Sequence, residues 1–285
     1  MQDLTEEWLK DAISKEHINY YDYDRFKVLE TLGEGASGIV YKSYWIENDL
    51  TVALKSLKFD TSCEKTIGKF VKELRLLLKV CNHQNIIRIY GITKDDQKMS
   101  YHMILQFAEG GNLREYLKKS FLKLGWASKL RIAKEIAQGI LFLHNNDIVH
   151  RDLHPQNILF HNDQVVISDF GLSYISTKTP ALLKSSKNYG MAAFTDPQYF
   201  KDGSYICDKK SDIYSLGVLL WEISSGRAPF HNLSPLTIAI RVVNGEREKH
   251  VEGTPKEFIR LYKKCWDNNS KERPSSRSAL AEIKI

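Results

Sequence analysis

The chain has 285 residues, of which 42% are apolar, and it contains 16 glycines and 7 prolines. This composition excludes low-complexity and collagen-like proteins and supplies enough apolar side chains for one large bilobal unit or two small domains. Lysine and arginine number 41 against 35 acidic residues, without any block of like charge. The resulting net charge of +6 fits an anionic ligand, and we expect no nucleic-acid partner.

Cysteine spacing and the N-terminal residues bear on cellular location. The four cysteines lie too far apart for a Cys-x-x-Cys metal or redox motif, which predicts reduced thiols at Cys63, Cys81, Cys207 and Cys265. The N-terminus is acidic where a signal peptide requires basic and then apolar residues, and Gln2 excludes a myristoylation start. The most apolar run, 213–223, contains Glu222 and has about half the length of a membrane span, so it predicts a buried helix. We therefore expect a soluble, cytoplasmic protein without membrane insertion.

Residues 1–25 are predicted to form an amphipathic helix and a connector. Thr5 is a candidate N-cap, and the apolar side chains that recur at helical spacing are Leu4, Trp8, Leu9, Ala12 and Ile13. The aromatic connector HINYYDYDRF ends at Phe26, where the pattern changes. Three roles are open for this helix: surface packing, which is favoured, a clamp on the unit that follows, or the end of a linker to other domains.

From residue 26 to about residue 106, short apolar runs alternate with glycine and turn residues, which predicts strands. We expect these strands at 27–31, 39–45, 51–57, 86–92 and 102–106. One helix interrupts them at 63–80. Its apolar stripe consists of Ile67, Phe70, Val71, Leu74, Leu77 and Leu78.

After the sequence EGGN at residues 109–112 the pattern becomes helical. We expect helices at 113–118, 128–145, 212–225, from 234 onward, at 255–266 and at 275–283. Between them, residues 150–173 contain two short apolar runs flanked by polar turn residues, which predicts a small hairpin of loops and strands.

Three glycines follow the first predicted strand, namely Gly33, Gly35 and Gly38. Without Cβ atoms, such a segment can approach a ligand closely and present its N–H groups to phosphate oxygens. Dinucleotide-binding folds share this spacing but continue into a helix, whereas the run from Ile39 to Tyr41 here continues as a strand. The spacing therefore favours a hairpin over phosphates, with a plain turn as the alternative.

Lys55 and Glu73 are predicted to form an ion pair. Lys55 ends the strand TVALK, and Glu73 lies on the apolar stripe of the helix rather than on the polar face with Lys72 and Arg75. A carboxylate on a buried face requires a partner, and Lys55 is the natural one. The pairing would hold the lysine extended toward phosphate oxygens, and an exposed strand lysine is the alternative.

Three oxygen donors, Asp152, Asn157 and Asp169, fall in the irregular segment of the second half. Carboxylate, amide and phosphate oxygens are the ligands that Mg²⁺ prefers, although each residue alone would be an ordinary turn residue. Other metal or hydrolase motifs are absent from the sequence: Arg151 stands between His150 and His154 where a zinc protease has glutamate, and no Gly-x-Ser-x-Gly occurs.

Together, these motifs resemble those of the protein kinase family over residues 26–285. The six ordered motifs are GEGASGIV, VALK, HRDLHPQN, SDFG, SDIYSLG and KERP. The resemblance implies an α+β, bilobal protein-kinase-like fold. Its N-lobe, 26–108, would be an antiparallel β-sheet with one main helix, and its C-lobe, 109–285, would be mainly α-helical.

The resemblance also implies roles for individual residues, with ATP and Mg²⁺ as cofactors. Lys55 would hold ATP phosphates, Asn157 and Asp169 would bind magnesium, and Asp152 would accept the proton of the substrate hydroxyl. Leu105 would be the gatekeeper at the back of the adenine pocket. The implied nucleotide-binding residues are Leu32, Gly33, Glu34, Gly35, Ala36, Ser37, Gly38, Val40, Ala53, Lys55, Glu73, Leu105, Gln106, Phe107, Ala108 and Leu159.

Two further features follow from the resemblance. Leu77, His150 and Phe170 would stack as an internal spine anchored by Asp212, which could equally be the N-cap of its helix. Arg151 would meet a phosphate on the segment after Gly171, added by an upstream kinase or by self-phosphorylation in trans. The candidate hydroxyls are Ser173, Tyr174, Ser176, Thr177, Thr179, Ser185, Ser186 and Tyr189, with Ser185 or Ser186 preferred.

Departures from the family pattern concern the substrate side. Gln198 stands where the family has glutamate, so we expect at most a neutral-to-charged hydrogen bond to Arg273 and a looser substrate platform. His154 replaces the lysine usual in serine/threonine kinases, and Met191 replaces a common threonine. The loop HRDLHPQN and the sequence CWDNNSKERPS look most like the tyrosine-kinase-like branch, which mostly phosphorylates Ser and Thr.

These residues predict an ATP- and magnesium-dependent protein kinase that acts on Ser or Thr, with Tyr still open, and that binds a protein substrate. Two alternatives remain. A pseudokinase scaffold would keep the fold and ATP without phosphate transfer, and a small-molecule kinase would share the lysine and magnesium groups. The long segment 177–200 favours a protein substrate.

Overall fold

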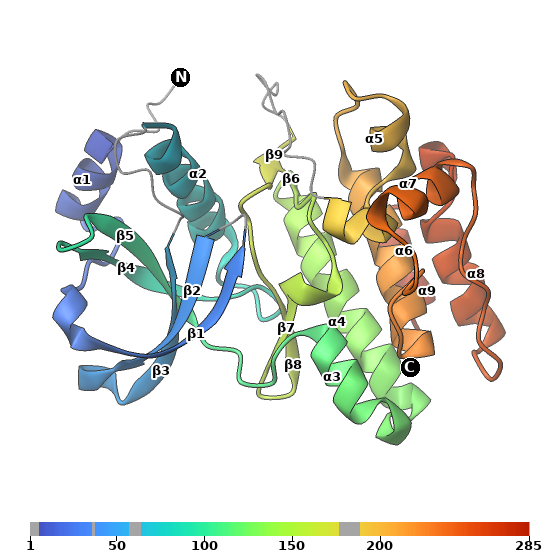
Figure 1. Cartoon of the computed structure of the whole chain (residues 1–285), viewed down its shortest axis with the longest axis horizontal. Coiled ribbons are helices and arrows are strands. Elements are labelled where there is room, and N and C mark those ends of the chain that lie inside the picture. The colour runs from blue at the N-terminus through green and yellow to red at the C-terminus, as the bar shows by residue number, and fades with distance from the viewer. Residues whose placement is uncertain (1–5, 36–37, 57–63, 177–188, 285) are drawn as a thin grey trace. The chain divides into compact units, whose positions relative to one another are not determined.

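The computed structural model describes residues 6–35, 38–56, 64–176 and 189–284, with backbone only for residues 64, 65, 189 and 190. The chain divides into two compact units. Unit 1 comprises residues 1–82, 86–108 and 169–171, and unit 2 comprises residues 83–85, 109–168 and 172–285. Figure 1 shows the strands mainly in the first part of the chain and the helices mainly in the second.

Unit 1 is built on a five-stranded antiparallel sheet in the order β1-β2-β3-β5-β4. Its strands are β1 (Phe26–Gly35), β2 (Gly38–Trp45), β3 (Leu50–Ser56), β4 (Ile89–Asp95) and β5 (Ser100–Gln106). The unit also contains the helices α1 (Glu6–Ser14) and α2 (Glu64–Val80) and the 3-10 turns η1 (Tyr23–Arg25) and η2 (Ile46–Asn48). The antiparallel sheet with one main helix confirms the fold expected for this part of the chain.

One face of this sheet forms the apolar core of unit 1. The buried cluster consists of Phe26, Trp45, Val52, Leu54 and Ile104, against which the connector tyrosines Tyr21 and Tyr23 also pack. Val52 and Leu54 alternate with Ala53 and Lys55 along β3. The strand therefore contributes Val52 and Leu54 to the core on one face and carries Ala53 and Lys55 on the other.

The fourth strand begins later than predicted. We expected a strand at 86–92, but β4 runs from Ile89 to Asp95. Ile86 and Ile87 are both buried in the segment that leads into β4, so burial of apolar side chains does not distinguish this segment from a strand. The polar end of β4 is fixed by its turn, where the Asp95 carboxylate accepts bonds from the backbone N–H groups of Gln97 and Lys98.

Unit 2 is mainly helical, as predicted. Its helices are α3 (Leu113–Ser120), α4 (Trp126–Asn145), α5 (Pro197–Lys201), α6 (Lys209–Ser225), α7 (Pro235–Val243), α8 (Lys256–Cys265) and α9 (Ser276–Glu282). Two small antiparallel sheets pair β6 (Ile148–Val149) with β9 (Tyr174–Ile175) and β7 (Ile158–His161) with β8 (Gln164–Ile167), and the second pair is a hairpin. The 3-10 turns are η3 (Phe121–Lys123), η4 (Pro155–Asn157), η5 (Tyr189–Phe194) and η6 (Ser270–Glu272). Only α5 has no counterpart among the predicted helices.

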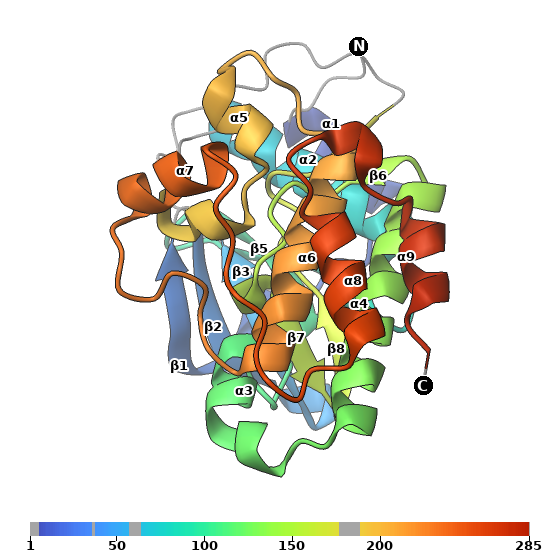
Figure 2. The same cartoon turned by 90° about the vertical axis from the view of Figure 1, so that its right-hand side faces the viewer.

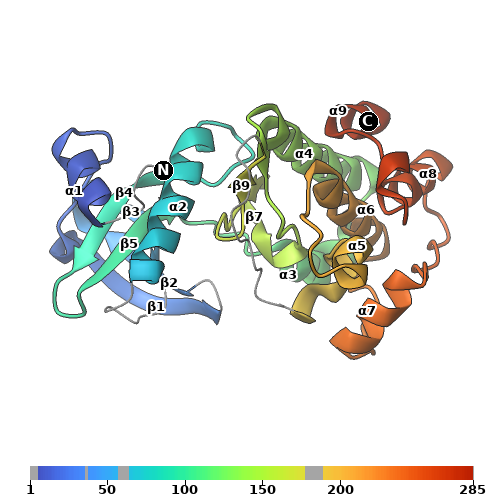
Figure 3. The ribbon, with the colours of Figure 1, turned by 90° about the horizontal axis from the view of Figure 1, so that it is seen from above.

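Helix α6 is the central element of unit 2. It packs against α4 and α8, and Figures 2 and 3 show it inside the helical unit while α7 lies at the edge. A Cβ on Gly217 would lie 2.8 Å from the backbone nitrogen of Trp266, so the close approach of α6 and α8 requires glycine there. The apolar run 213–223 is buried within α6, as expected.

Two expectations about the chain's environment can be compared with the structure. Cys81, Cys207 and Cys265 are free thiols, and Cys63 lies outside the described residues. No helix in the described ranges combines the length and the hydropathy needed to cross a bilayer.

His102 on β5 gives unit 1 a pH-dependent stability. Its imidazole lies 5.4 Å from the ring centre of Tyr23 and 6.2 Å from that of Tyr41, bonds to the Ser100 hydroxyl at 3.1 Å, and is 3% exposed. Burial lowers the pKa of His102 from 6.5 to about 4, although the charge of Asp95 acts in the opposite direction. The unfolded chain therefore takes up a proton that the folded chain resists.

We expect this histidine to reduce the free energy of unfolding as the pH falls from 6.5 to about 4, by about 3 kcal/mol in total. Above pH 6.5 both states are neutral and the full stability is present. Urea unfolding of the wild type and of His102→Gln across this range would isolate the contribution, because glutamine does not titrate. Parallel pH profiles for the two proteins would contradict the prediction.

Candidate active site

A buried cluster of one cation and two carboxylates lies in unit 1. The Nζ of Lys55 is 2.5 Å from Oε1 of Glu73 and 2.9 Å from Oδ1 of Asp169. Lys55 and Glu73 are 6% and 3% exposed, so water competes little for these bonds. The ion pair that the apolar position of Glu73 predicts is therefore present, with Asp169 as an additional partner.

The charges of this cluster depend on one another. Burial alone would lower the pKa of Lys55, but Glu73 and Asp169 outweigh burial and raise it above its ordinary value. Burial raises the pKa of Glu73, against the effects of Lys55 and of a hydrogen bond from the backbone N–H of Phe170. Lys55 is thus a permanent cation held extended by two acceptors.

The backbone around Asp169 is constrained. Asp169 has φ +62°, in the left-handed region that few residues other than glycine adopt. Its Oδ1 also accepts a bond from the backbone N–H of Gly171 at 3.2 Å. Strained backbone of this kind persists only where the surroundings determine it and is frequent at functional sites.

The sheet register places the predicted ligand residues of unit 1 on one face. Val40 pairs with Lys55 across β2 and β3, and Ala53 pairs with Leu105 across β3 and β5. Cross-strand partners share a face, so these four side chains lie on the same side of the sheet. Met103 pairs with Lys55, is 1% exposed and belongs to this face too. It was not predicted from the sequence, because nothing in the apolar run around it sets Met103 apart from its neighbours.

The glycine hairpin is open on its inner side. Gly33 and Gly35 lie on β1, and no atom of the described residues lies within 4 Å of a Cβ built on either. Packing within the described chain therefore gives no reason for glycine at these two positions. Glu34 lies on β1, Gly38 begins β2, and the tip residues Ala36 and Ser37 lie outside the described residues.

The remaining residues predicted to bind the nucleotide are only partly buried. Leu32 on β1 is 46% exposed. Gln106, Phe107 and Ala108 are half-buried at the end of β5 and beyond it. Leu159 is half-buried on β7 of unit 2.

In unit 2, hydrogen bonds hold Asp152 and Asn157 together. Nδ2 of Asn157 donates to the backbone oxygen of Asp152 at 2.9 Å, and the backbone oxygen of Asn157 accepts from the N–H of Ser168. Using its nitrogen in this way turns the amide oxygen of Asn157 away from that carbonyl. The side chain of Asp152 is 22% exposed.

Asp212 fixes the backbone before Asp152. Its two carboxylate oxygens accept bonds from the N–H groups of His150 at 2.9 Å and Arg151 at 2.8 Å, and His144 lies 2.9 Å away. The N-cap of α6 is Asp208, whose carboxylate bonds to the N–H groups of Lys210 and Ser211, so the alternative of Asp212 as the cap is wrong.

His154 lies beside the predicted catalytic groups. Its Nε2 is 3.1 Å from Nδ2 of Asn157 and 3.6 Å from Oδ1 of Asp152, and the residue is 8% exposed. From the sequence, His154 was notable only because serine/threonine kinases usually have lysine at this position. The structure places the imidazole against both polar groups.

Two of the candidate phosphorylation sites are engaged in the interior of unit 2. The Ser173 hydroxyl donates to the backbone oxygen of His150, and the Tyr174 hydroxyl donates to the backbone oxygen of Cys207 at 2.9 Å. The guanidinium of Arg151 lies 5.6 Å from the centre of the Tyr174 ring. Ser176 is half-buried, only the backbone of Tyr189 is described, and Thr177, Thr179, Ser185 and Ser186 lie outside the described residues.

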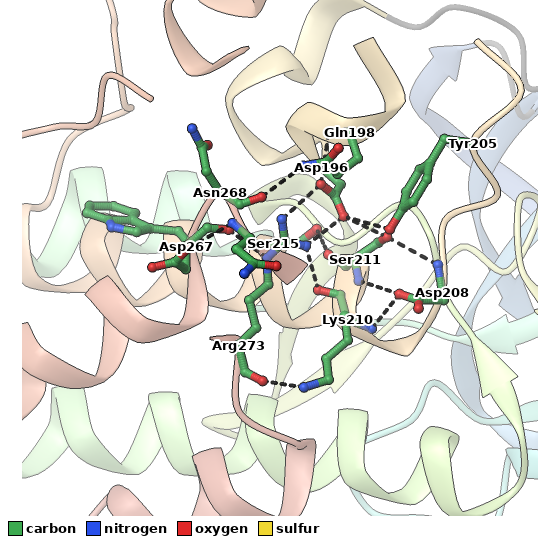
Figure 4. Close-up of polar contacts among 12 residues, drawn as sticks. Asp196, Gln198, Tyr205, Asp208, Lys210, Ser211, Ser215, Asp267, Asn268 and Arg273 are labelled. Carbon is green, nitrogen blue, oxygen red and sulfur yellow. Dashed lines mark hydrogen bonds and ion pairs between the residues drawn. The ribbon is translucent and has the colours of Figure 1, made fainter. Parts of the chain in front are cut away.

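Arg273 is held by a full ion pair, which corrects the expectation drawn from Gln198. Nη1 and Nη2 of Arg273 lie 2.6 Å and 3.0 Å from the two carboxylate oxygens of Asp196, and both side chains are 0% exposed (Figure 4). Gln198 instead donates from Nε2 to the backbone oxygen of Asn268 at 2.9 Å. The charge that the family's glutamate would supply comes here from an aspartate two residues before Gln198.

The surroundings satisfy the remaining polar groups of this pair. Ser211 donates to Oδ2 of Asp196 at 2.9 Å, and Nε of Arg273 donates to the backbone oxygen of Asp267 at 2.8 Å (Figure 4). Lys210 donates to the backbone oxygen of Arg273. The start of α5 is thus tied to α6 and to the segment before α9, and the expected loosening of this region is not present.

Among the residues that the structure describes, no three His, Cys, Asp or Glu side chains are grouped as a metal site. The donors predicted for magnesium are the carboxylate of Asp169 and the amide oxygen of Asn157. Both are hard oxygen ligands, which fits a cation that takes its other ligands from phosphate and water.

Comparison with known proteins covers nearly the whole chain. The family model "protein tyrosine and serine/threonine kinase" matches residues 26–283. A LIM domain-containing serine/threonine-protein kinase of Dictyostelium discoideum is 30% identical over 97% of this chain and 42% of its own length. Mitogen-activated protein kinase kinase kinase 7 of Drosophila melanogaster is 32% identical over 90% of this chain and 36% of its own length.

A serine/threonine-protein kinase/receptor of Acanthamoeba polyphaga mimivirus is 31% identical over 89% of this chain and 15% of its own length. The chain therefore spans less than half the length of these three curated relatives.

The buried pair makes Asp196 more important for stability than Gln198. We expect Asp196→Asn to lower the free energy of unfolding by about 3–5 kcal/mol, because it leaves the Arg273 charge buried without a counter-charge. Gln198→Leu is the control, because it removes the hydrogen bond to the backbone oxygen of Asn268 without adding a charge. It should lower the free energy of unfolding by about 1 kcal/mol. Urea unfolding of both variants measures the difference, and equal losses would contradict this assignment.

Proposed function

The chain belongs to the family of protein tyrosine and serine/threonine kinases, and from this premise we propose that it transfers the γ-phosphate of ATP to serine or threonine hydroxyls of protein substrates. The observation that carries the proposal is the buried contact of Lys55 with both Glu73 and Asp169. Burying these three charges costs desolvation energy, and such a cluster is expected where a fixed cation serves the chemistry.

Each charged residue has a distinct role in the proposed reaction. Lys55 would bind the phosphates of ATP, and Glu73 would hold Lys55 in its extended conformation. Asp169 and Asn157 would hold Mg²⁺, which neutralises charge on the phosphates when it is bound. The open inner side of Gly33 and Gly35 would admit the phosphates to backbone N–H groups.

Asp152 would orient the substrate hydroxyl and accept its proton. As the hydroxyl oxygen forms its bond to the γ-phosphorus, the bond from that phosphorus to the leaving oxygen of ADP breaks. The contacts with Asn157 hold Asp152 in place before the substrate arrives, so little reorganisation is required.

The adenine would contact the face of the sheet that carries Val40, Ala53 and Leu105. Apolar side chains suit the ring, and polar backbone groups at residues 106–108 suit its edge. Leu32 and Leu159 would complete the apolar contacts. Gln106, Phe107 and Ala108 would provide the backbone groups.

Serine and threonine are the proposed acceptors because the relatives named above are serine/threonine-protein kinases. The location would be cytoplasmic, where ATP is available and where the free thiols Cys81, Cys207 and Cys265 stay reduced. Control by an upstream kinase or by self-phosphorylation in trans would act through Arg151, whose charge can pair with a phosphate.

A pseudokinase scaffold is the alternative, and it would bind ATP without transfer. The retained groups Lys55, Glu73, Asp152, Asn157 and Asp169 speak against it, because a scaffold has no need to keep all five.

The proposed function predicts that Asp152→Asn abolishes activity. Loss of the proton acceptor should lower the rate of phosphate transfer at least 100-fold while the fold and ATP binding persist. We would measure magnesium-dependent transfer of labelled phosphate from ATP to a mixed protein substrate, followed by phosphoamino-acid analysis.

The melting temperature with and without ATP is the control for this experiment. Transfer by the wild type that disappears in the variant, with the ATP-induced shift retained in both, is the expected result. Absence of transfer by the wild type despite an ATP-induced shift would favour the scaffold.

A further inference from the structure

Helix α1 packs against α2, the helix that carries Glu73 (Figure 1). Leu9 and Ala12 of α1 are 0% and 3% exposed, so one face of α1 is part of the interior of unit 1. The guanidinium of Arg75 on α2 lies 3.8 Å from the centre of the Trp8 ring, which is a close cation–π contact.

The contact corrects the expected position of Arg75. We placed Arg75 on the polar face of the helix, but it is half-buried. Burial lowers its pKa, and its Nη2 is buried with no hydrogen-bond partner among the described residues. The face of the Trp8 ring therefore supplies much of the compensation that this cation receives in place of water.

Glu73 and Arg75 hold α2 from two directions. Two residues correspond to about 200° around an α-helix, so their side chains point to nearly opposite sides. On one side Glu73 bonds to Lys55, and on the other Arg75 lies on Trp8. Rotation of α2 about its axis would disturb both contacts at once.

The ends of the N-terminal segment are fixed independently of α2. Near the start of α1, the Tyr101 hydroxyl on β5 donates to Oε1 of Glu6 at 3.2 Å. After α1, the N–H of Ile92 on β4 donates to the backbone oxygen of Asn19 at 2.9 Å, and the N–H of Tyr21 donates to the oxygen of Ile92 at 3.0 Å. The sheet thus provides a fixed base from which α1 can hold α2.

We infer that α1 positions Glu73 for its pairing with Lys55, and that Trp8, through Arg75, is the positioning residue. The inference rests on the proposed kinase function, in which that ion pair must be formed for transfer. Among the three roles open for the N-terminal helix, it selects the clamp. Plain surface packing would stabilise unit 1 without any specific link to Glu73.

The test is a double-mutant cycle on the full chain, measured as kcat/KM for ATP. Trp8→Ala should lower kcat/KM about five-fold. Trp8→Phe retains an aromatic face and should restore most of the loss. Lys10→Ala is the control and should leave kcat/KM unchanged, because the Lys10 side chain is 68% exposed and its surface ion pair with Glu6 contributes little.

The decisive comparison uses Glu73→Gln as the second background. If Trp8 acts through the Lys55–Glu73 pair, Trp8→Ala has no further effect once Glu73 is replaced. An equal loss in both backgrounds, or a change in melting temperature alone, would overturn the inference.

Hydrogen exchange of the α2 amides provides a readout that does not require activity. Trp8→Ala should speed exchange across residues 66–80 while Lys10→Ala does not, and unchanged exchange would overturn the inference. A wild type without phosphate transfer would contradict the proposed function, and the exchange result would then decide the role of Trp8 separately.

Discussion

The ion cluster around Lys55 imposes the strictest constraint on unit 1. A buried ammonium group is tolerable only with counter-charges, and here the sheet supplies the cation while α2 and the residue at position 169 supply the anions. Three separate stretches of chain must therefore reach a common point. The strand alternation, the rotation of α2 and the left-handed backbone at Asp169 all serve this geometry.

In unit 2, neutral and charged hydrogen bonds hold the segment that ends at Asp152 in place. Asp212, buried on α6, accepts from two consecutive backbone N–H groups before Asp152. Asn157 then holds the carbonyl of Asp152 itself. The half-buried carboxylate of Asp152 is thus the end of a chain of interior contacts.

Local patterns could predict the elements and the pairing of Glu73, because an acidic residue on an apolar stripe is unexpected without a partner. They failed where the partner comes from a distant segment. The spacing of Arg75 on the helix indicates a solvent-facing residue, but a residue of α1 covers it. Arg273 lacks the family's glutamate partner, and Asp196 takes the place of that glutamate. The position of β4 was wrong because two consecutive apolar residues can be buried in a loop as readily as in a strand.

The contact between Asp196 and Arg273 has a consequence for the conditions under which unit 2 keeps its shape. Mobile ions screen charges that they can approach, and both of these side chains are closed to solvent. A surface pair such as Lys264 and Glu282 weakens as ionic strength rises. The buried pair that ties the start of α5 to the segment before α9 is screened much less, so this attachment changes little as ionic strength rises.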